Sequence, residues 1–227
     1  AMDPQQRLVL ETGWEALEQS GHAPNSFSDK PLGIFLGLAN SDYGRSLLGD
    51  MPAIDPYFTS GLAFSVASGR LAYFLGSRGS AISLDTACSS SLVAIHLACH
   101  ALKSGECDIA LAGGANVILS PEVHVNFSRA GMLASDGLCK TFDDGADGYV
   151  RGEGCILFVL RRLEDAQADG DNILAIIRGS AINQDGRSNG LTAPNGPAQE
   201  ALIKTALDDA GVKASTIGYV ETHGTGT

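Results

Sequence analysis

The sequence predicts an α/β fold in which helices alternate with the strands of a mostly parallel sheet. Short apolar runs at 33–37, 81–84 and 108–114 are typical of buried strands. Longer segments with helical periodicity separate these runs, and the spacing from strand to helix to strand suits a right-handed crossover. The 227 residues can bury a sizeable core, and the 28 glycines have no fixed period. We interpret these glycines as turns and close backbone contacts of such a fold.

The elements are expected in a simple order along the chain. The first is an amphipathic helix that ends near residue 20 and has Leu10, Trp14 and Leu17 on its apolar face. Further helices are expected at 63–75, 89–103 and 198–210, and strands at 33–37, 81–84, 108–114, 155–160, 173–180 and 217–220. The remaining segments at 38–60, 120–153 and 183–197 are expected to be loops, with short helices in the second. No linker, repeat or compositional break is evident, so we expect one domain over 1–227.

Composition and charge exclude several classes of protein. The net charge of −11 and the lack of any Lys/Arg-rich run argue against nucleic acid as a partner. No apolar stretch is long enough to cross a bilayer, so no membrane association is expected. Five cysteines without a CxxC pair or a signal-peptide pattern predict free thiols in a reducing compartment, the cytoplasm.

The strongest candidate for chemistry is Cys88, in the segment Asp-Thr-Ala-Cys-Ser-Ser-Ser at 85–91. This segment joins a predicted strand to a predicted helix, so the sulfur is expected to face the first N–H groups of the helix. The positive end of the helix dipole favours thiolate over thiol, and the backbone N–H of Cys88 can serve as an oxyanion-hole donor. A cysteine also suits thioester exchange, because its acylated form is itself a thioester. The alternative is a small buried residue before a helix capped by Ser89.

A second candidate is His223, in the segment Glu-Thr-His-Gly-Thr-Gly-Thr at 221–227. Its small neighbours would let a substrate arm pass closely, and threonine hydroxyls can hydrogen-bond an amide or hydroxyl of that arm. The alternative is a polar turn whose histidine faces solvent.

One pair of histidines has the spacing of metal ligands. His96 and His100 are four residues apart on a predicted helix, a spacing that can bind a metal ion. No third ligand is evident, so packing is the favoured interpretation and no metal site is predicted.

The two segments together resemble the signature blocks of the β-ketoacyl synthase (ketosynthase) domains of type I, modular polyketide synthases, which are thiolase-fold condensing enzymes. Further blocks fit this family in its own order, at 3–7, 69–73, 112–116, 139–143, 146–154 and 183–186. The resemblance implies a thiolase-like layered α/β/α/β/α fold that is incomplete at both ends. Residues 1–227 would be the N-terminal half of a ketosynthase domain and the start of its C-terminal half.

The resemblance also implies a reaction. Cys88 would take an acyl chain from the phosphopantetheine of an acyl carrier protein, and a malonyl-type extender would then lose carbon dioxide and attack the acyl group. His223 would assist decarboxylation and stabilise the enolate, and Thr225 and Thr227 would hold the phosphopantetheine arm. No bound cofactor is implied. The implied partners are an acyl carrier protein, acyl and malonyl-type thioesters, and a second copy of the chain in a homodimer.

Two alternatives stay open. The first is a fatty-acid condensing enzyme of the same fold, although the loop at 183–197 and the sequence Tyr-Val-Arg at 149–151 favour a polyketide enzyme. The second is a catalytically incomplete fragment. The family uses a second histidine, a lysine and a glycine-phenylalanine loop on later segments, so residues 1–227 alone are not expected to complete the condensation.

Overall fold

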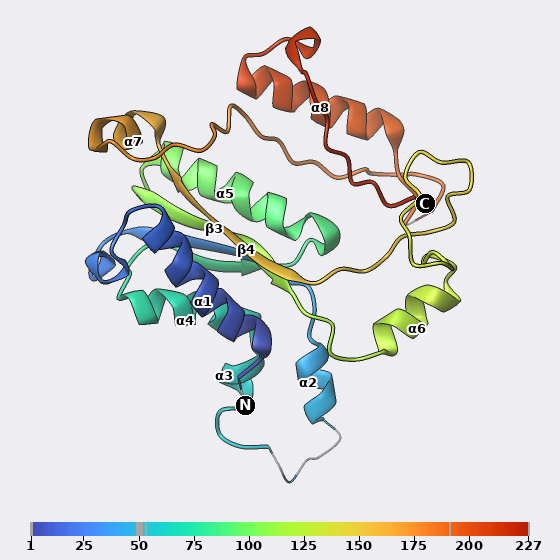
Figure 1. Ribbon diagram of the computed structural model, residues 1–227, viewed down its shortest axis with the longest axis horizontal. Helices are drawn as coiled ribbons and strands as arrows, with labels where there is room; N and C mark the ends of the chain where they lie inside the picture. Colours follow the sequence, from blue (N-terminus) through green and yellow to red (C-terminus); the bar gives the residue numbers. More distant parts are fainter. Residues whose placement is uncertain (1, 49–51, 53, 191, 227) are drawn as a thin grey trace. The chain divides into compact units, whose positions relative to one another are not determined.

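The computed structural model describes residues 2–48, 52, 54–190 and 192–226 (Figure 1). The chain divides into two compact units. The first comprises Ala1–Arg162 with Glu221–Thr227, and the second comprises Leu163–Val220.

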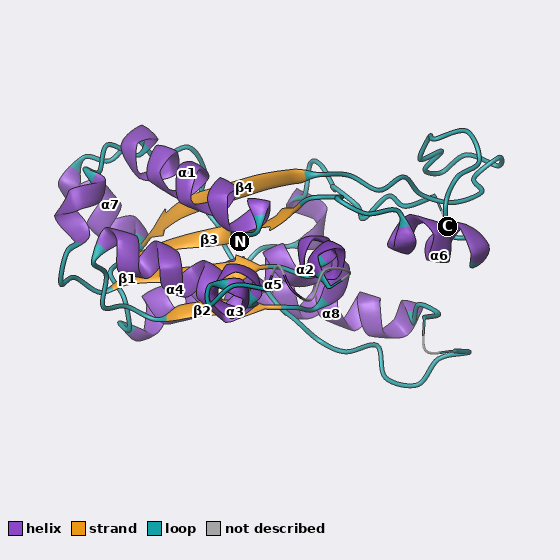
Figure 2. Cartoon of the chain, turned by 90° about the horizontal axis from the view of Figure 1, so that it is seen from below, coloured by secondary structure: helices purple, strands orange, loops and turns teal. Residues whose placement is uncertain are grey.

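The first unit is built on a four-stranded sheet with the strand order β2-β1-β3-β4, which Figure 2 shows. The strands are β1 (Leu32–Gly37), β2 (Ala81–Leu84), β3 (Ile109–Asn116) and β4 (Gly154–Arg161). β1 is parallel to both β2 and β3, whereas β4 is antiparallel to β3. All four coincide with predicted strands, and the mostly parallel arrangement is confirmed.

Helices cover both faces of this sheet, with α1 and α4 on one side and α5 on the other (Figure 1). The alternation of side chains along β1 explains both contacts. Ile34 and Leu36 join the core under α1 and α4, while Phe35 joins the core under α5. The helices of this unit are α1 (Pro4–Gln19), η1 (Pro24–Phe27), α2 (Asp42–Leu47), α3 (Phe58–Leu62), α4 (Phe64–Leu75), η3 (Ala87–Ser89), α5 (Ser90–Ser104) and α6 (Glu122–Arg129).

The second unit contains α7 (Leu163–Asp169), α8 (Gly196–Ala210) and η4 (Ala214–Thr216). Hydrogen bonds tie an extended segment before α8 to that helix. The backbone N–H of Ser180 donates to Asp209 over 2.9 Å, and the side-chain amide of Asn183 donates to the carbonyl oxygen of Ala198 over 2.8 Å.

The sequence interpretation was wrong at three segments. Residues 173–180 and 217–220 are described but form no strand, because neither is hydrogen-bonded to a neighbouring strand in the sheet that the described residues build. Their apolar side chains stay exposed, and Leu174 is 91% exposed. The expected loop at 38–60 contains α2 and α3. The apolar patterns at 173–180 and 217–220 predicted strands, but a strand also requires hydrogen bonds to a neighbouring strand.

Asp42 links two of the connections that leave the carboxyl ends of the parallel strands. Its carboxylate is 1% exposed, accepts the backbone N–H groups of Leu119 (3.0 Å) and Ser120 (3.2 Å), and forms an ion pair with Arg45. Burial raises the pKa of this carboxyl. The hydrogen bonds from Asn40, Leu119 and Ser120 and the charge of Arg45 outweigh that effect, so the pKa lies below its ordinary value.

The first prediction concerns this carboxylate. Asp42→Asn should weaken the local fold by about 2 kcal/mol at pH 7, because charged hydrogen-bond acceptors are stronger than neutral ones. Backbone hydrogen exchange at Leu119 and Ser120 should accelerate roughly 30-fold. Since the folded-state pKa is lowered, the contribution is complete above the unfolded-state pKa near ~4 and is lost as the pH falls through the folded-state pKa.

The control is Glu11→Gln, which changes an exposed acid on α1. It should leave exchange at Leu119 and Ser120 as it is in the unaltered protein. A difference between Asp42→Asn and the unaltered protein that is the same at neutral and strongly acid pH would contradict the prediction.

Candidate active site

Cys88 lies in a tight turn, η3, between the end of β2 and the start of α5. Its side chain is exposed, which removes the alternative of a small buried residue. The preceding residue, Ala87, has φ +54°, a left-handed conformation that costs a non-glycine residue about 1–2 kcal/mol. The sharp strand-to-helix turn that the sequence predicts is therefore present, and it is held under local strain.

Hydrogen bonds close the turn from both sides of Cys88. A carboxylate oxygen of Asp85 accepts the N–H of Ala87 over 2.8 Å. The hydroxyl of Ser90 accepts the N–H of Thr86 over 2.9 Å and donates to the carbonyl oxygen of Ala87 over 2.6 Å. The hydroxyl of Ser89 donates to the carbonyl oxygen of Thr86 over 2.9 Å.

The alternative interpretation of Cys88 had Ser89 cap the helix. Ser89 is the residue before α5, which begins at Ser90, but its side chain makes no capping hydrogen bond. Its hydroxyl is instead used within the turn. The serines after the nucleophile candidate thus stabilise the turn more than the helix.

The segment that carries His223 docks on the loop between α6 and β4, although the two are far apart in sequence. The hydroxyl of Thr141 donates to the carbonyl oxygen of Gly224 over 2.5 Å, and the N–H of Gly148 donates to the carbonyl oxygen of Gly226 over 3.0 Å. His223 is exposed and Thr225 is half-buried. Thr227, the other predicted arm-binding residue, lies outside the described residues.

Tyr149, in the same loop, is close enough to Cys88 to be affected by its charge. Burial raises the pKa of the Tyr149 phenol and the charge of Cys88 raises it further, whereas Arg151 lowers it. The Tyr149 ring packs against Phe127 with 6.1 Å between centroids, and the Arg151 guanidinium lies 5.9 Å from the Phe127 centroid. Cys88 and His223 belong to one compact unit, in which the loop contacts the His223 segment.

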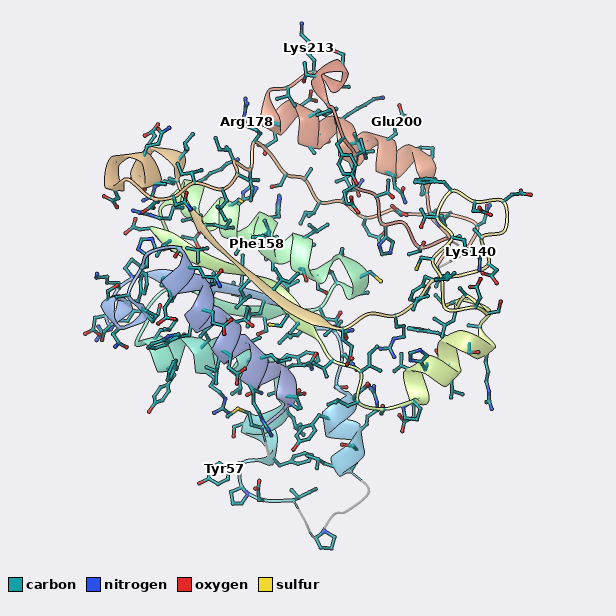
Figure 3. All side chains as sticks on the ribbon, in the orientation of Figure 1. Tyr57, Lys140, Phe158, Arg178, Glu200 and Lys213 are labelled. Carbon is teal, nitrogen blue, oxygen red and sulfur yellow. The ribbon has the colours of Figure 1, made fainter. Side chains whose placement is uncertain are left out.

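A lysine at the centre of the same loop orders it. Lys140, labelled in Figure 3, forms ion pairs with Asp136 (2.7 Å) and Asp147 (2.6 Å). The hydroxyl of Ser135 also donates to Asp147, over 2.8 Å. The hydrogen bond from Lys140, followed by that from Ser135, lowers the pKa of Asp147 to about 2. Asp147 is thus ionised throughout the physiological pH range.

His96 and His100 pack ring against ring on α5, with 4.4 Å between centroids. Among the described residues, no group of three or more His, Cys, Asp or Glu side chains is arranged to hold a metal ion. In the same part of the chain, none of the helices is long and apolar enough to span a membrane.

Comparison with known proteins identifies the family. Residues 1–166 match the family model described as beta-ketoacyl synthase, N-terminal domain, and residues 174–227 match the one described as beta-ketoacyl synthase, C-terminal domain. The chain belongs to the beta-ketoacyl synthase family.

Members that resemble the chain come from polyketide synthases. A phenolphthiocerol/phthiocerol polyketide synthase protein of Mycobacterium tuberculosis is 53% identical over 229 residues, which are 100% of the chain and 10% of that protein. Polyketide synthase GfsB of Streptomyces halstedii is 53% identical over 227 residues, 100% of the chain and 4% of that protein. The chain thus spans a tenth or less of the length of these two relatives.

A solved structure gives the same answer for the fold. The ketosynthase from module 6 of the bacillaene synthase from Bacillus subtilis 168 superposes with a TM-score of 0.91 at 46% identity. The match covers 100% of this chain and 38% of that one. The thiolase-like fold that the resemblance implied is confirmed for this part of it.

Sequence reasoning found the family blocks but missed what several of their residues do. Thr141 falls in the block at 139–143, yet only the structure shows that it holds the His223 segment. The sequence did contain a signal for the role of Ser90 in the turn. Three consecutive serines follow the candidate nucleophile, and a helix cap requires only one of them.

The second prediction tests the loop. Asp147→Asn should make backbone exchange over 132–150 several-fold faster, because it removes the ion pair with Lys140 and weakens the hydrogen bond from Ser135. With a folded-state pKa of about 2, the effect of Asp147 is present above the unfolded-state value and is lost only in strong acid. The protection factors of the unaltered loop should therefore be the same at pH ~5 and pH ~8.

Asp144→Asn is the matched control, since it removes an exposed acid from the same loop. The prediction is wrong if both variants change the exchange of the loop equally.

Proposed function

We propose that the chain is part of a single ketosynthase domain of polyketide biosynthesis, with 1–227 acting together in it. The domain transfers an acyl chain from a carrier protein to Cys88 and then condenses it with a malonyl-type extender. The observation that carries the proposal is the exposed Cys88 on a strained, hydrogen-bonded turn at the start of α5. Membership of the beta-ketoacyl synthase family and the polyketide synthase relatives support it.

In the first step, the Cys88 thiolate attacks the thioester carbonyl of the incoming acyl chain. A new carbon–sulfur bond forms, the bond to the phosphopantetheine sulfur breaks, and the carrier thiolate leaves. α5 begins at Ser90, so the first backbone N–H groups of the helix, which have no partner within it, follow Cys88 directly in the chain. The backbone N–H of Cys88 is the proposed donor to the oxyanion of the tetrahedral intermediate.

In the second step, the extender loses carbon dioxide and its enolate carbon attacks the acyl-Cys88 thioester. A carbon–carbon bond forms, the bond from the acyl carbon to the Cys88 sulfur breaks, and the Cys88 thiolate is released. His223 donates a hydrogen bond to the enolate oxygen, where negative charge develops. The glycines on its C-terminal side support this role: Gly224 has φ +64° and Gly226 has φ +69°, so the backbone turns here without bulky side chains. Thr225 and Thr227 are the proposed contacts to the phosphopantetheine arm.

The proposed partners are an acyl carrier protein, which carries both thioesters on phosphopantetheine, and a second copy of the chain. A homodimer is supported by β2, which is at the edge of the sheet and exposes Ile82 by 41%. The five free cysteines support a reducing compartment, and we propose the cytoplasm. A fatty-acid condensing enzyme would use the same chemistry, but the relatives described above favour a polyketide synthase.

The third prediction tests the nucleophile in the full-length natural protein. Incubation with an acyl-phosphopantetheine thioester should add one acyl group to the peptide that contains Cys88, as measured by peptide mass spectrometry. Cys88→Ala should abolish this adduct. Cys139→Ala is the control, because it removes another exposed thiol and should leave the adduct in place. An acyl group that persists in Cys88→Ala would contradict the proposal.

The fourth prediction separates the two steps. His223→Ala should acylate Cys88 at nearly the normal rate but release carbon dioxide from a malonyl thioester about 10²–10³-fold more slowly, because a fixed donor to the enolate is lost. Labelled carbon dioxide and acyl-peptide formation measure the two steps independently. His22→Gln, at the far end of α1, should change neither. Equal loss of both steps in His223→Ala would show that the residue acts on folding or on acylation instead.

A further inference from the structure

We propose that Gly37, with Gly114 beside it, is a positioning residue for the acylation of Cys88. The two glycines let the first turn of α5 lie directly on the sheet, and this contact places Ser90 where its hydroxyl closes the turn of Cys88. The inference rests on the proposed role of Cys88 as nucleophile.

Gly37 and Gly114 lie side by side near the carboxyl ends of the two central strands. Gly37 ends β1, and Gly114 is its register partner on β3. A Cβ placed on Gly37 would lie 2.6 Å from the carbonyl carbon of Ser90 and 2.6 Å from the backbone nitrogen of Ser91. A Cβ on Gly114 would collide with the hydroxyl of Ser91 and lie 2.5 Å from the carbonyl oxygen of Gly37. Both positions therefore exclude any side chain.

The atoms that a Cβ on Gly37 would meet determine which part of the structure must move. They belong to the backbone of α5, which cannot rotate away as a flexible side chain can. Because nonbonded carbon atoms prefer roughly 3.5–4 Å, an alanine would push the start of α5 from the sheet by about 1 Å.

The displacement reaches Cys88 through Ser90. The Ser90 side chain is 5% exposed, and its hydroxyl holds both the N–H of Thr86 and the carbonyl oxygen of Ala87. These groups lie directly before Cys88, and Ala87 is the strained residue of the turn. Moving Ser90 releases the constraint that keeps Ala87 at positive φ, so the sulfur of Cys88 loses its fixed direction.

Gly33, in the same strand, provides a control for the general effect of disturbing the core packing. A Cβ on Gly33, also in β1, would meet a ring carbon of Phe35 at 2.8 Å and the sulfur of Cys107 at 3.0 Å. Both atoms belong to core side chains and not to the backbone of α5. A Cβ on Gly154, at the start of β4, would have no described atom within 4 Å.

The experiment uses the full-length natural protein and measures two rates at Cys88 across a range of pH. One is acylation by an acyl-phosphopantetheine thioester, and the other is alkylation by iodoacetamide. Gly37→Ala should slow acylation roughly 100-fold, the typical effect of a 1 Å misplacement, and should alter the pH profile of alkylation. Gly33→Ala and Gly154→Ala should keep the pH profile and stay within about 3-fold of the normal acylation rate.

Ser90→Ala provides the same test without a collision, and it covers the case in which Gly37→Ala fails to fold. It should slow acylation to a similar extent, and the double variant should be little slower than either single one, because both changes break one contact. The positioning role is overturned if Gly33→Ala and Gly37→Ala are equally slow with an unchanged pH profile, or if Ser90→Ala acylates at the normal rate.

Failure of the proposed function would give a different result. If the unaltered protein is not acylated at Cys88, the function proposed above fails. The pH profile of alkylation still reports whether Gly37 sets the environment of the thiol.

Discussion

The close contact between the first turn of α5 and the carboxyl ends of β1 and β3 is the constraint on which the rest of the site depends. Parallel strands present their carboxyl ends at one edge, and this edge is where connections and functional groups gather. Here β1 ends at Gly37, and its register partner Gly114 lies near the end of β3, so the helix touches the sheet backbone itself. The helix that follows the turn of Cys88 therefore packs directly on the backbone of the sheet.

The hydrogen bonds of the turn explain how it tolerates the strained backbone at Ala87. The positive φ of Ala87 costs about 1–2 kcal/mol, and each hydrogen bond in a folded protein contributes about 1 kcal/mol net. The hydrogen bonds that Asp85 and Ser90 form with the backbone of Thr86 and Ala87 are enough to offset this cost. A glycine in place of Ala87 would remove the strain but would also give the unfolded chain more freedom, so the turn would be less well defined.

The sequence predicted the first unit well because its elements carry local signals. The strand at 33–37 and the helix at 63–75 have apolar patterns that match buried surfaces, and β1 and α4 lie where these patterns place them. The segments at 173–180 and 217–220 have equally apolar patterns and form no strand, since pairing depends on a neighbour that no local pattern contains. Likewise Cys88 and His223 could be named from their motifs, but the contact of Thr141 with Gly224 joins residues far apart in sequence.

Cys88 and His223 have different kinds of structural support. The turn of Cys88 is followed by Ser90 and Ser91, which lie so close to Gly37 and Gly114 that no side chain fits at either glycine. His223 is carried by a segment that docks on a loop held by exposed ion pairs of Lys140. Exposed ion pairs contribute little stability, so this loop can move at low cost. An attack by the proposed nucleophile, Cys88, at one fixed angle suits the first kind of support. The proposed hydrogen bond of His223 to the enolate of an incoming extender suits the second.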